Sequence, residues 1–283
     1  MPFVLWNVSE VVMRNFFIKD PPLWSLNVMN GTNLLFEDIT CNATAVNAPF
    51  GVNWVQNTDG FDTMDVNNVV MRNFVVQNGD DCVAIKPRSY NVLVENATCH
   101  GGNGMAIGSL GQYLDIDASV ENVVIRDVTL INYNNDLHNS AYIKCWVGVP
   151  VVQSSYESAD TSSLGPGYGG GYGKVSNITF SDFLVYGAAA GPAITEDSGD
   201  NHTVPGTSKL AVSDIYFTNF KGYLAGSTTE GSVSCSSIYP CYNIFFENIE
   251  LTSEENSTSY LTAGKCSYIQ PGGVHGLNGS TCS

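Results

Sequence analysis

Charged side chains are scarce in this sequence, and basic ones are the scarcest. Only 13% of the 283 residues are charged, about half the usual share. Lysine and arginine together number 11 against 27 aspartate and glutamate residues, which leaves a net charge of −16. Because phosphate binding needs clustered basic residues, this composition excludes a nucleic-acid partner and a polybasic membrane anchor.

Long apolar runs and helical patterns are also missing. No apolar run approaches the roughly 18 residues that a membrane-spanning helix needs. Capped stretches with a period of 3.6 residues are nearly absent. The hydrophobic share of 43% still allows a sizeable core, so a disordered chain is unexpected. We therefore expect an all-β protein, and a single domain over residues 1–283, since all-β domains often reach this length.

A short strand pattern recurs along the chain. It alternates apolar and other residues, places Asn or Asp near its end, and is rich in Val, Ile and Phe, which is a strand signature. Its copies end at Phe16, Ile39, Phe74, Ala97, Val128, Phe183, Phe220 and Ile249. The intervals are 23, 35, 23, 31, 55, 37 and 29 residues, which fits one coil per repeat plus inserted loops.

Hairpin signals do not separate these repeats, so the strands are expected to stack in parallel as a β-helix solenoid. The apolar residues would then face the interior, and Asn residues of neighbouring coils would form ladders that satisfy buried amides. A β-propeller is the alternative, but its period is nearer 40–50 residues and more even. The longest insertion spans about 148–174; it is either a surface loop or a cleft wall carrying Tyr168 and Tyr172.

The first residues, MPFVLWNVSEVV, resemble the middle of a repeat and not a signal peptide. We therefore expect a β-helix that lacks its N-terminal coils and cap. An uncapped solenoid exposes apolar surface and strand edges, which predicts instability or aggregation of the chain as given.

Eight cysteines and eight Asn-x-Ser/Thr sequons favour a secreted, glycosylated protein. Eight cysteines allow 105 full pairings. Proximity in sequence suggests the pairs Cys235–Cys241 and Cys266–Cys282. Cys41 and Cys145 are expected to remain as buried thiols.

Three acidic or amide-bearing motifs fall about one coil apart: NTDGFD at 57–62, NGDDCVAIK at 78–86 and CHGGNGMAIGS at 99–109. Asp59 and Asp80 are 21 residues apart, and Asp81 and Asn103 are 22 apart. Strands of a sheet lie ~4.8 Å apart, so groups one coil apart are ~5 Å apart and groups two coils apart ~10 Å. The spacing therefore gathers Asp59, Asp80 and Asp81 on one face.

Such a cluster of carboxylates has a chemical consequence. Like charges this close raise at least one pKa, which supplies a general acid beside a general base. Carboxyl pairs ~6.5–9.5 Å apart leave room for a water and predict glycoside hydrolysis with inversion. The alternative is that these aspartates are turn residues at coil corners, as we expect for Asp62 and Asp65.

These blocks resemble the signature sequences of the polygalacturonase family, the family 28 glycoside hydrolases, and a fourth block, AYIK at 141–144, stands where that family usually has Arg-Ile-Lys. The resemblance implies a right-handed parallel β-helix and metal-independent, inverting hydrolysis of pectin without a cofactor. Asp80 matches the general acid, and Asp59 and Asp81 match the pair that positions and deprotonates water. Lys144 matches the lysine that holds a sugar carboxylate.

The resemblance also implies a Cys82–Cys99 disulfide that would join the two catalytic coils. At this loop length a bridge contributes ~3 kcal/mol in the chain-entropy model. Three aromatic residues flank the motif blocks and are expected to pack in the core or at the rim: Trp54, Tyr113 and Trp146.

The sequence departs from the family at two substrate-binding positions. Asn103 replaces a customary His, and it can donate a hydrogen bond but cannot titrate. His100 lies nearby and can substitute only if the turn is remodelled; otherwise it is a surface residue. Tyr142 replaces an Arg, so a bidentate carboxylate clamp is lost and a ring suited to stacking on a sugar is gained.

These observations predict a secreted, monomeric exo-polygalacturonase with an acidic optimum that acts on pectic polysaccharide or oligosaccharide. The departures keep two alternatives open. One is an exo-hydrolase directed at rhamnogalacturonan, and the other is a catalytically weakened pectin-binding β-helix. A β-eliminating lyase would need a calcium site and a basic side chain as its base.

Overall fold

The computed structural model describes residues 2–43, 55, 57–151, 168–198, 204–279 and 281–282. These residues form fifteen β-strands. They contain no helix long and apolar enough to cross a membrane. Trp54 and most of the insertion predicted over 148–174 lie outside the described residues.

The strands are β1 (Phe3–Lys19), β2 (Leu26–Asn42), β3 (Phe61–Gln77), β4 (Val83–Ile85), β5 (Ser89–His100), β6 (Met105–Leu110), β7 (Val120–Ile131), β8 (Ala141–Trp146), β9 (Tyr172–Ala188), β10 (Ala193–Ser198), β11 (Lys209–Leu224), β12 (Gly231–Ser234), β13 (Tyr242–Thr252), β14 (Gly264–Ser267) and β15 (Val274–His275).

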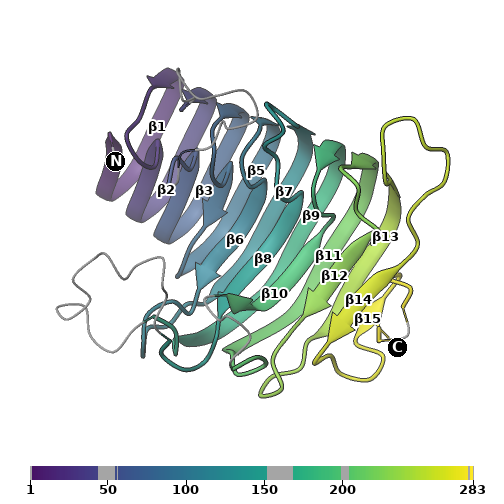
Figure 1. Ribbon diagram of the computed structural model, residues 1–283. Helices are drawn as coiled ribbons and strands as arrows, with labels where there is room; N and C mark the ends of the chain where they lie inside the picture. Colours follow the sequence, from purple (N-terminus) through teal and green to yellow (C-terminus); the bar gives the residue numbers. More distant parts are fainter. Residues whose placement is uncertain are drawn as a thin grey trace.

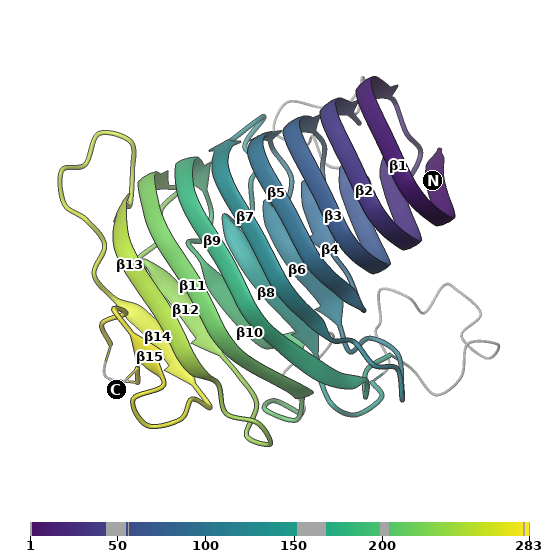
Figure 2. The same ribbon diagram turned by 180° about the vertical axis from the view of Figure 1, so that it is seen from behind.

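The strands wind into a stack of parallel coils (Figures 1 and 2). The first three strands are 17 residues long, and β3 shows how the coil bends. Its residues Phe61–Thr63 pair with β4, whereas its residues from Val66 to Gln77 pair with β5. From there on, one row runs β4-β6-β8-β10-β12-β14 and the other β5-β7-β9-β11-β13-β15. The predicted parallel β-helix is confirmed.

Pairing follows the sequence repeat. Every end point predicted from the pattern is paired with the end point of the next copy: Phe16 with Ile39, Ile39 with Phe74, Phe74 with Ala97, Ala97 with Val128, Val128 with Phe183, Phe183 with Phe220, and Phe220 with Ile249. The variable intervals are therefore loops inserted between strands of constant register.

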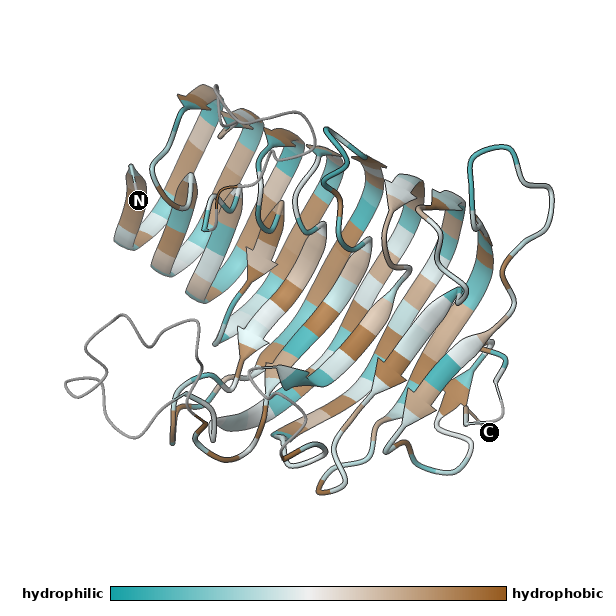
Figure 3. Cartoon of the chain, viewed as in Figure 1, coloured by the Kyte–Doolittle hydropathy of each residue, from teal (hydrophilic) through white to brown (hydrophobic). Residues whose placement is uncertain are grey.

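Apolar and polar residues alternate along the strands (Figure 3), and the apolar set is buried in the interior. Identical positions of neighbouring coils then stack. Phe180 lies on Phe217 with ring centroids 5.2 Å apart, and Phe183 lies on Phe220 at 4.5 Å. All four rings are fully buried. Such aromatic pairs contribute ~0.5–1.5 kcal/mol beyond the burial of their area, so the stack favours this register over a slipped one.

Asparagine ladders form, but on the outside of the coils and not around buried amides as predicted. Exposed side chains donate from one coil to the next, as in Asn91 to Asn67 at 2.7 Å and Asn122 to Asn91 at 3.1 Å. Asn91 and Asn122 have φ angles of 56° and 60°. Asn tolerates this left-handed conformation better than most residues, so Asn marks the sharp bends of the coil.

Two of the three predicted disulfides are present, Cys235–Cys241 and Cys266–Cys282. Cys41 and Cys145 are buried thiols, as predicted. The predicted Cys82–Cys99 bridge is not formed, and both residues are buried thiols. Burial strongly raises the pKa of Cys99.

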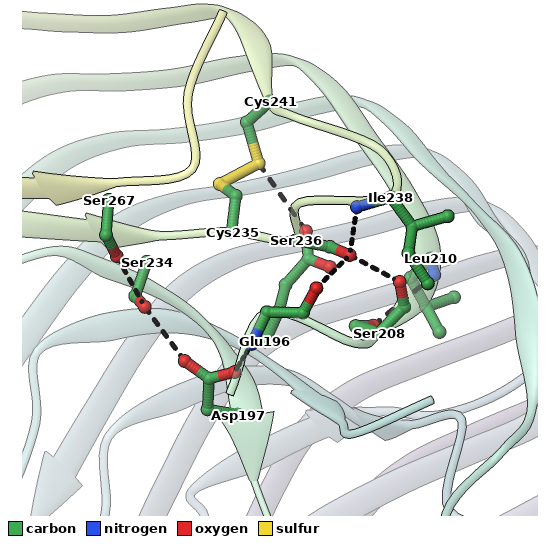
Figure 4. The surroundings of a disulfide bond; sticks show 11 residues. Glu196, Asp197, Ser208, Leu210, Ser234, Cys235, Ser236, Ile238, Cys241 and Ser267 are labelled. Atoms are coloured by element: carbon green, nitrogen blue, oxygen red, sulfur yellow. Dashed lines mark hydrogen bonds between the residues drawn. A yellow bond between two sulfur atoms is a disulfide. The ribbon is translucent and has the colours of Figure 1, made fainter. Parts of the chain in front are cut away.

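A buried acid lies against one disulfide, outside the predicted site (Figure 4). Glu196 on β10 is fully buried, and its Oε1 is 3.5 Å from the Sγ of Cys241. Burial raises the pKa of Glu196 from 4.5 to about 8. Folding therefore favours the protonated acid, because an ionised carboxylate at this buried position loses its hydration.

This acid predicts a pH-dependent stability. Between pH 4.5 and about 8 the unfolded chain ionises Glu196 while the folded protein keeps the proton, so stability falls as pH rises. In Glu196→Gln this loss is absent. We expect the fall in Tm between pH 5 and pH 8 to be smaller in the variant, by roughly 2–4 °C for each ~1 kcal/mol recovered.

Thermal unfolding followed by circular dichroism at both pH values measures this difference. Glu247→Gln, an exposed glutamate on β13, is the matched control and should follow the wild-type pH dependence. Equal pH dependence in Glu196→Gln and wild type would contradict the assignment.

Candidate active site

The candidate site lies where successive coils enter one row of short strands. Asp59 precedes β3, Asp80 and Asp81 precede β4, and Asn103 precedes β6. Because Phe61 pairs with Val83 and Val83 with Met105, the residues two positions earlier, Asp59, Asp81 and Asn103, are equivalent positions of three coils. Backbone hydrogen bonds continue through these turns, from Gly60 N to Asp81 O at 2.9 Å and from Asn103 N to Asp80 O at 2.9 Å. The predicted stacking is confirmed.

Two glycines allow the third turn to lie close to its neighbours on both sides. Gly102 and Gly104 have φ angles of 75° and 82°. A Cβ on Gly102 would lie 2.2 Å from the carbonyl oxygen of Asp80, and one on Gly104 would lie 2.3 Å from that of Asn139. The glycines around Asn103 are therefore required by close backbone approach.

The three aspartates come together as expected. One carboxylate oxygen from each lies within 4.8 Å of the others. Asp80 accepts three hydrogen bonds: from the backbone N of Asn57 at 2.8 Å, from its neighbour Asp81 N at 2.9 Å, and from the Nδ2 of Asn103 at 2.9 Å. Asn103 thus contacts a candidate catalytic acid directly.

Asp81 is held by the fourth motif. Tyr142 and Lys144 are two residues apart on β8 and point to the same side. The hydroxyl of Tyr142 donates to Asp81 Oδ1, and Lys144 Nζ donates to Asp81 Oδ2 at 2.7 Å. Tyr142 is only 6% exposed, so the expected stacking on a sugar face is wrong. The ring is enclosed by the strands, and its hydroxyl orients a carboxylate.

Asp59 is the most perturbed of the three acids. It is buried, and both its burial and the neighbouring charges of Asp62 and Asp81 raise its pKa well above the ordinary range. The predicted rise of at least one pKa is therefore confirmed.

Two charged residues of this cluster were not recognised in the sequence. Asp62, expected to be an ordinary turn acid, is fully buried on β3, and burial raises its pKa to about 6. Lys86 follows β4 with its Nζ 3.2 Å from Asp62 and 3.6 Å from Asp59. Both residues lie inside the motif blocks. The position of Asp62, three residues after Asp59, was the feature of the sequence that could have placed it in the cluster. Asp65, by contrast, pairs with Arg88.

A cavity of about 510 Å³ opens above the cluster. Its polar lining includes Asp59, Asp80, Asp81, Lys86, Arg88 and Lys144, and its aromatic lining Trp24, Tyr113, Trp146 and Tyr168. His100, at the end of β5, is not among its lining residues, and burial lowers its pKa. The structure therefore does not bring His100 to the aspartates. Asn103, in the turn at 102–104, is the residue that contacts Asp80.

The aromatic residues form one wall of the cavity. Tyr168 packs against Tyr113 and Trp146, with ring centroids 5.9 Å and 5.7 Å apart. Trp146 is 5% exposed and packs in the interior, and Tyr113 is 52% exposed and lies at the rim. Both positions agree with the expectation of core or rim packing. Tyr168 therefore belongs to the cleft wall, whereas Tyr172 begins β9 and is not among the lining residues.

The three carboxylates are close enough together for one cation to contact all of them. However, Asp59 and Asp81 already have the ammonium groups of Lys86 and Lys144 beside them. Because these lysines supply the positive charge, we assign no metal ligand here. Metal-independent chemistry stays a prediction.

Comparison with known proteins agrees with this geometry. The sequence pattern of "Glycosyl hydrolases family 28" matches residues 2–156 and 167–272. The chain is 57% identical over 280 residues to a protein of Aspergillus niger named "Putative galacturan 1,4-alpha-galacturonidase C", covering 99% of this chain and 64% of that protein. It is 38% identical over 226 residues to "Exopolygalacturonase X" of Aspergillus niger, covering 78% of this chain and 48% of that one. The chain thus spans less than two thirds of the length of these relatives.

A solved structure supports the same conclusion. The endo-xylogalacturonan hydrolase from Aspergillus tubingensis superposes with a TM-score of 0.77 at 25% identity, over 99% of this chain and 68% of that protein. With the family pattern matched along nearly all of its length, the chain belongs to the glycosyl hydrolases of family 28.

Proposed function

We propose that this protein is an exo-acting glycoside hydrolase that removes galacturonate units from the end of galacturonan chains. One observation carries the proposal: three carboxylates of consecutive coils meet at the base of one cavity, beside lysine ammonium groups. The relatives named as a galacturan 1,4-alpha-galacturonidase and an exopolygalacturonase favour an exo mode and this substrate.

The distribution of charge supports an acidic substrate. The chain has only 11 basic residues and a net charge of −16, yet Lys86, Arg88 and Lys144 all line this cavity. Lys144 directs Nζ to Asp81 at 2.7 Å and to the hydroxyl of Tyr142 at 3.2 Å. An ammonium has three donors, so Lys144 can also bind a sugar carboxylate while it holds Asp81.

In the proposed reaction Asp80 donates a proton to the glycosidic oxygen as the bond to the anomeric carbon breaks. Asp59 and Asp81 position a water and take its proton, and the water oxygen bonds to the anomeric carbon. One water is consumed, and each product gains a hydroxyl group. Asn103 orients Asp80, and Tyr142 and Lys144 orient Asp81.

The separation of the carboxylates does not by itself establish inversion. Oxygens of all three aspartates lie within 4.8 Å, nearer than the ~6.5–9.5 Å typical of an inverting pair of carboxyl groups. Inversion therefore rests on the family resemblance. We also propose that the protein acts outside the cell, because its two disulfides persist in oxidising compartments.

The first test is product analysis with trigalacturonate labelled at its reducing end with ¹⁸O. We expect mass spectrometry to find unlabelled galacturonate and labelled digalacturonate as the first products, because an exo-enzyme removes the non-reducing unit. A rhamnogalacturonan oligosaccharide is incubated in parallel. Asp80→Asn is the matched control and should lose activity, because the amide cannot donate the acid's proton.

Shortening of the rhamnose-containing substrate alone would replace the galacturonan assignment with the rhamnogalacturonan alternative. Binding without cleavage of either substrate would favour a pectin-binding protein. Wild-type activity in Asp80→Asn would remove Asp80 from the mechanism.

A second test concerns the tyrosine that replaces an arginine. Tyr142→Phe removes the hydrogen bond to Asp81 but keeps the buried ring. A hydrogen bond to a charged group contributes ~1.5–3 kcal/mol, so we expect kcat/KM to fall about 10- to 100-fold while Tm changes little. Steady-state kinetics on trigalacturonate measures this. Unchanged kcat/KM would contradict a role for Tyr142 in orienting Asp81.

A further inference from the structure

Lys86 is a buried cation enclosed by the catalytic cluster. Its side chain is 12% exposed, and its Nζ lies 3.2 Å from Asp62 Oδ1 and 3.6 Å from Asp59 Oδ2. The same ammonium lies 4.5 Å from the centre of the Trp24 ring, a distance at which a cation is attracted to the face of an aromatic ring. The lysine is thus fixed by two carboxylates and a ring.

The other cations of the cavity are directed elsewhere. Lys144 pairs with Asp81, and Arg88 with Asp65. Asp59 faces three further carboxylates: Asp62 from β3, and Asp80 and Asp81 from the turn before β4. Within the described residues, Lys86 is the only cation whose ion pair reaches Asp59.

These neighbours act on Asp59 in opposite directions. Burial and the three carboxylates raise its pKa, and Lys86 lowers it. A base must be ionised when the substrate arrives, and an acidic medium makes this harder. Among the groups that act most strongly on Asp59, Lys86 alone opposes its protonation.

We propose that Lys86 is a positioning residue of the reaction: it stabilises the ionised form of Asp59, and Asp62 and Trp24 hold its ammonium in place, so that Asp59 can help to take a proton from the attacking water. This inference rests on the proposed hydrolase function. It adds a residue whose role in the reaction is exerted through Asp59.

The test is the pH profile of kcat/KM on trigalacturonate for wild type, Lys86→Met and Lys86→Arg. An opposite charge at this distance shifts a carboxyl pKa by about 1–3 units. We therefore expect the acid limb of the Lys86→Met profile to move up by about 1–3 pH units, which is a tenfold loss per unit at a fixed acidic pH. Lys86→Arg keeps the cation and should leave the limb near its wild-type position.

Lys86→Gln provides a second variant. It removes the ammonium and keeps a polar side chain beside Asp62 and Asp59, so the acid limb should again move to higher pH. It keeps the inference testable if Lys86→Met does not fold. Lys174→Met is the control, because Lys174 pairs with Glu121 at 2.8 Å on the outer surface and should not move the limb.

The outcomes are distinguishable. Loss of activity by the same factor at every pH in Lys86→Met, or an acid limb at the wild-type position in Lys86→Gln, would overturn the inference and leave Lys86 a structural role. If wild type cleaves no substrate, the proposed function fails. A carbon-13 NMR titration of the aspartate carboxyl groups then decides on Lys86, because Asp59 should still titrate at higher pH in Lys86→Gln than in wild type.

Discussion

The register of parallel pairing is the constraint on which the rest of this structure depends. Each strand carries side chains to alternate faces, so a slip of one residue would expose its buried set. The stacked rings of Phe180 and Phe217 and of Phe183 and Phe220 add a further preference for one alignment. Loops of very different length are inserted without changing this alignment. The same register that buries the phenylalanines places Asp59 and Asp81 on adjacent coils.

Bringing these carboxylates together creates an electrostatic problem that the site solves with lysine. Four aspartates, Asp59, Asp62, Asp80 and Asp81, occupy one region, and three of them are buried. Lys86 and Lys144 contribute two ammonium groups at its edges. Part of the remaining charge is relieved at Asp62, because burial raises the pKa of this carboxyl to about 6 and it is protonated in acid. A protein with few basic residues thus places two of them where these acids meet.

The sequence predicted the coil architecture and the meeting of Asp59, Asp80 and Asp81, because both follow from spacing alone. The prediction was wrong for residues whose role depends on the direction in which the side chain points. Tyr142 was expected to face the sugar. Side chains two residues apart on a strand share one face, so Tyr142 lies beside Lys144, and its hydroxyl reaches Asp81. Asp62 was taken for a turn acid because its partner, Lys86, belongs to the next coil. The Asn ladders were correctly expected but lie outside, since Asn serves there as a left-handed bend residue.

The cysteines illustrate a different limit. Neighbouring positions on stacked coils bring Cys82 and Cys99 together, and spacing alone does not tell whether two adjacent buried thiols are oxidised. For Cys235–Cys241 and Cys266–Cys282 the short separation in sequence was a sufficient guide.

In the proposed reaction the three aspartates direct a water, and not one of their own carboxylates, onto the anomeric carbon. Proton NMR of the first product released from α-linked trigalacturonate tests this most directly, because it resolves the anomers before they interconvert. Direct attack by water predicts that β-galacturonate appears first. Initial release of α-galacturonate would mean a covalent intermediate on one of these aspartates and would contradict the claim.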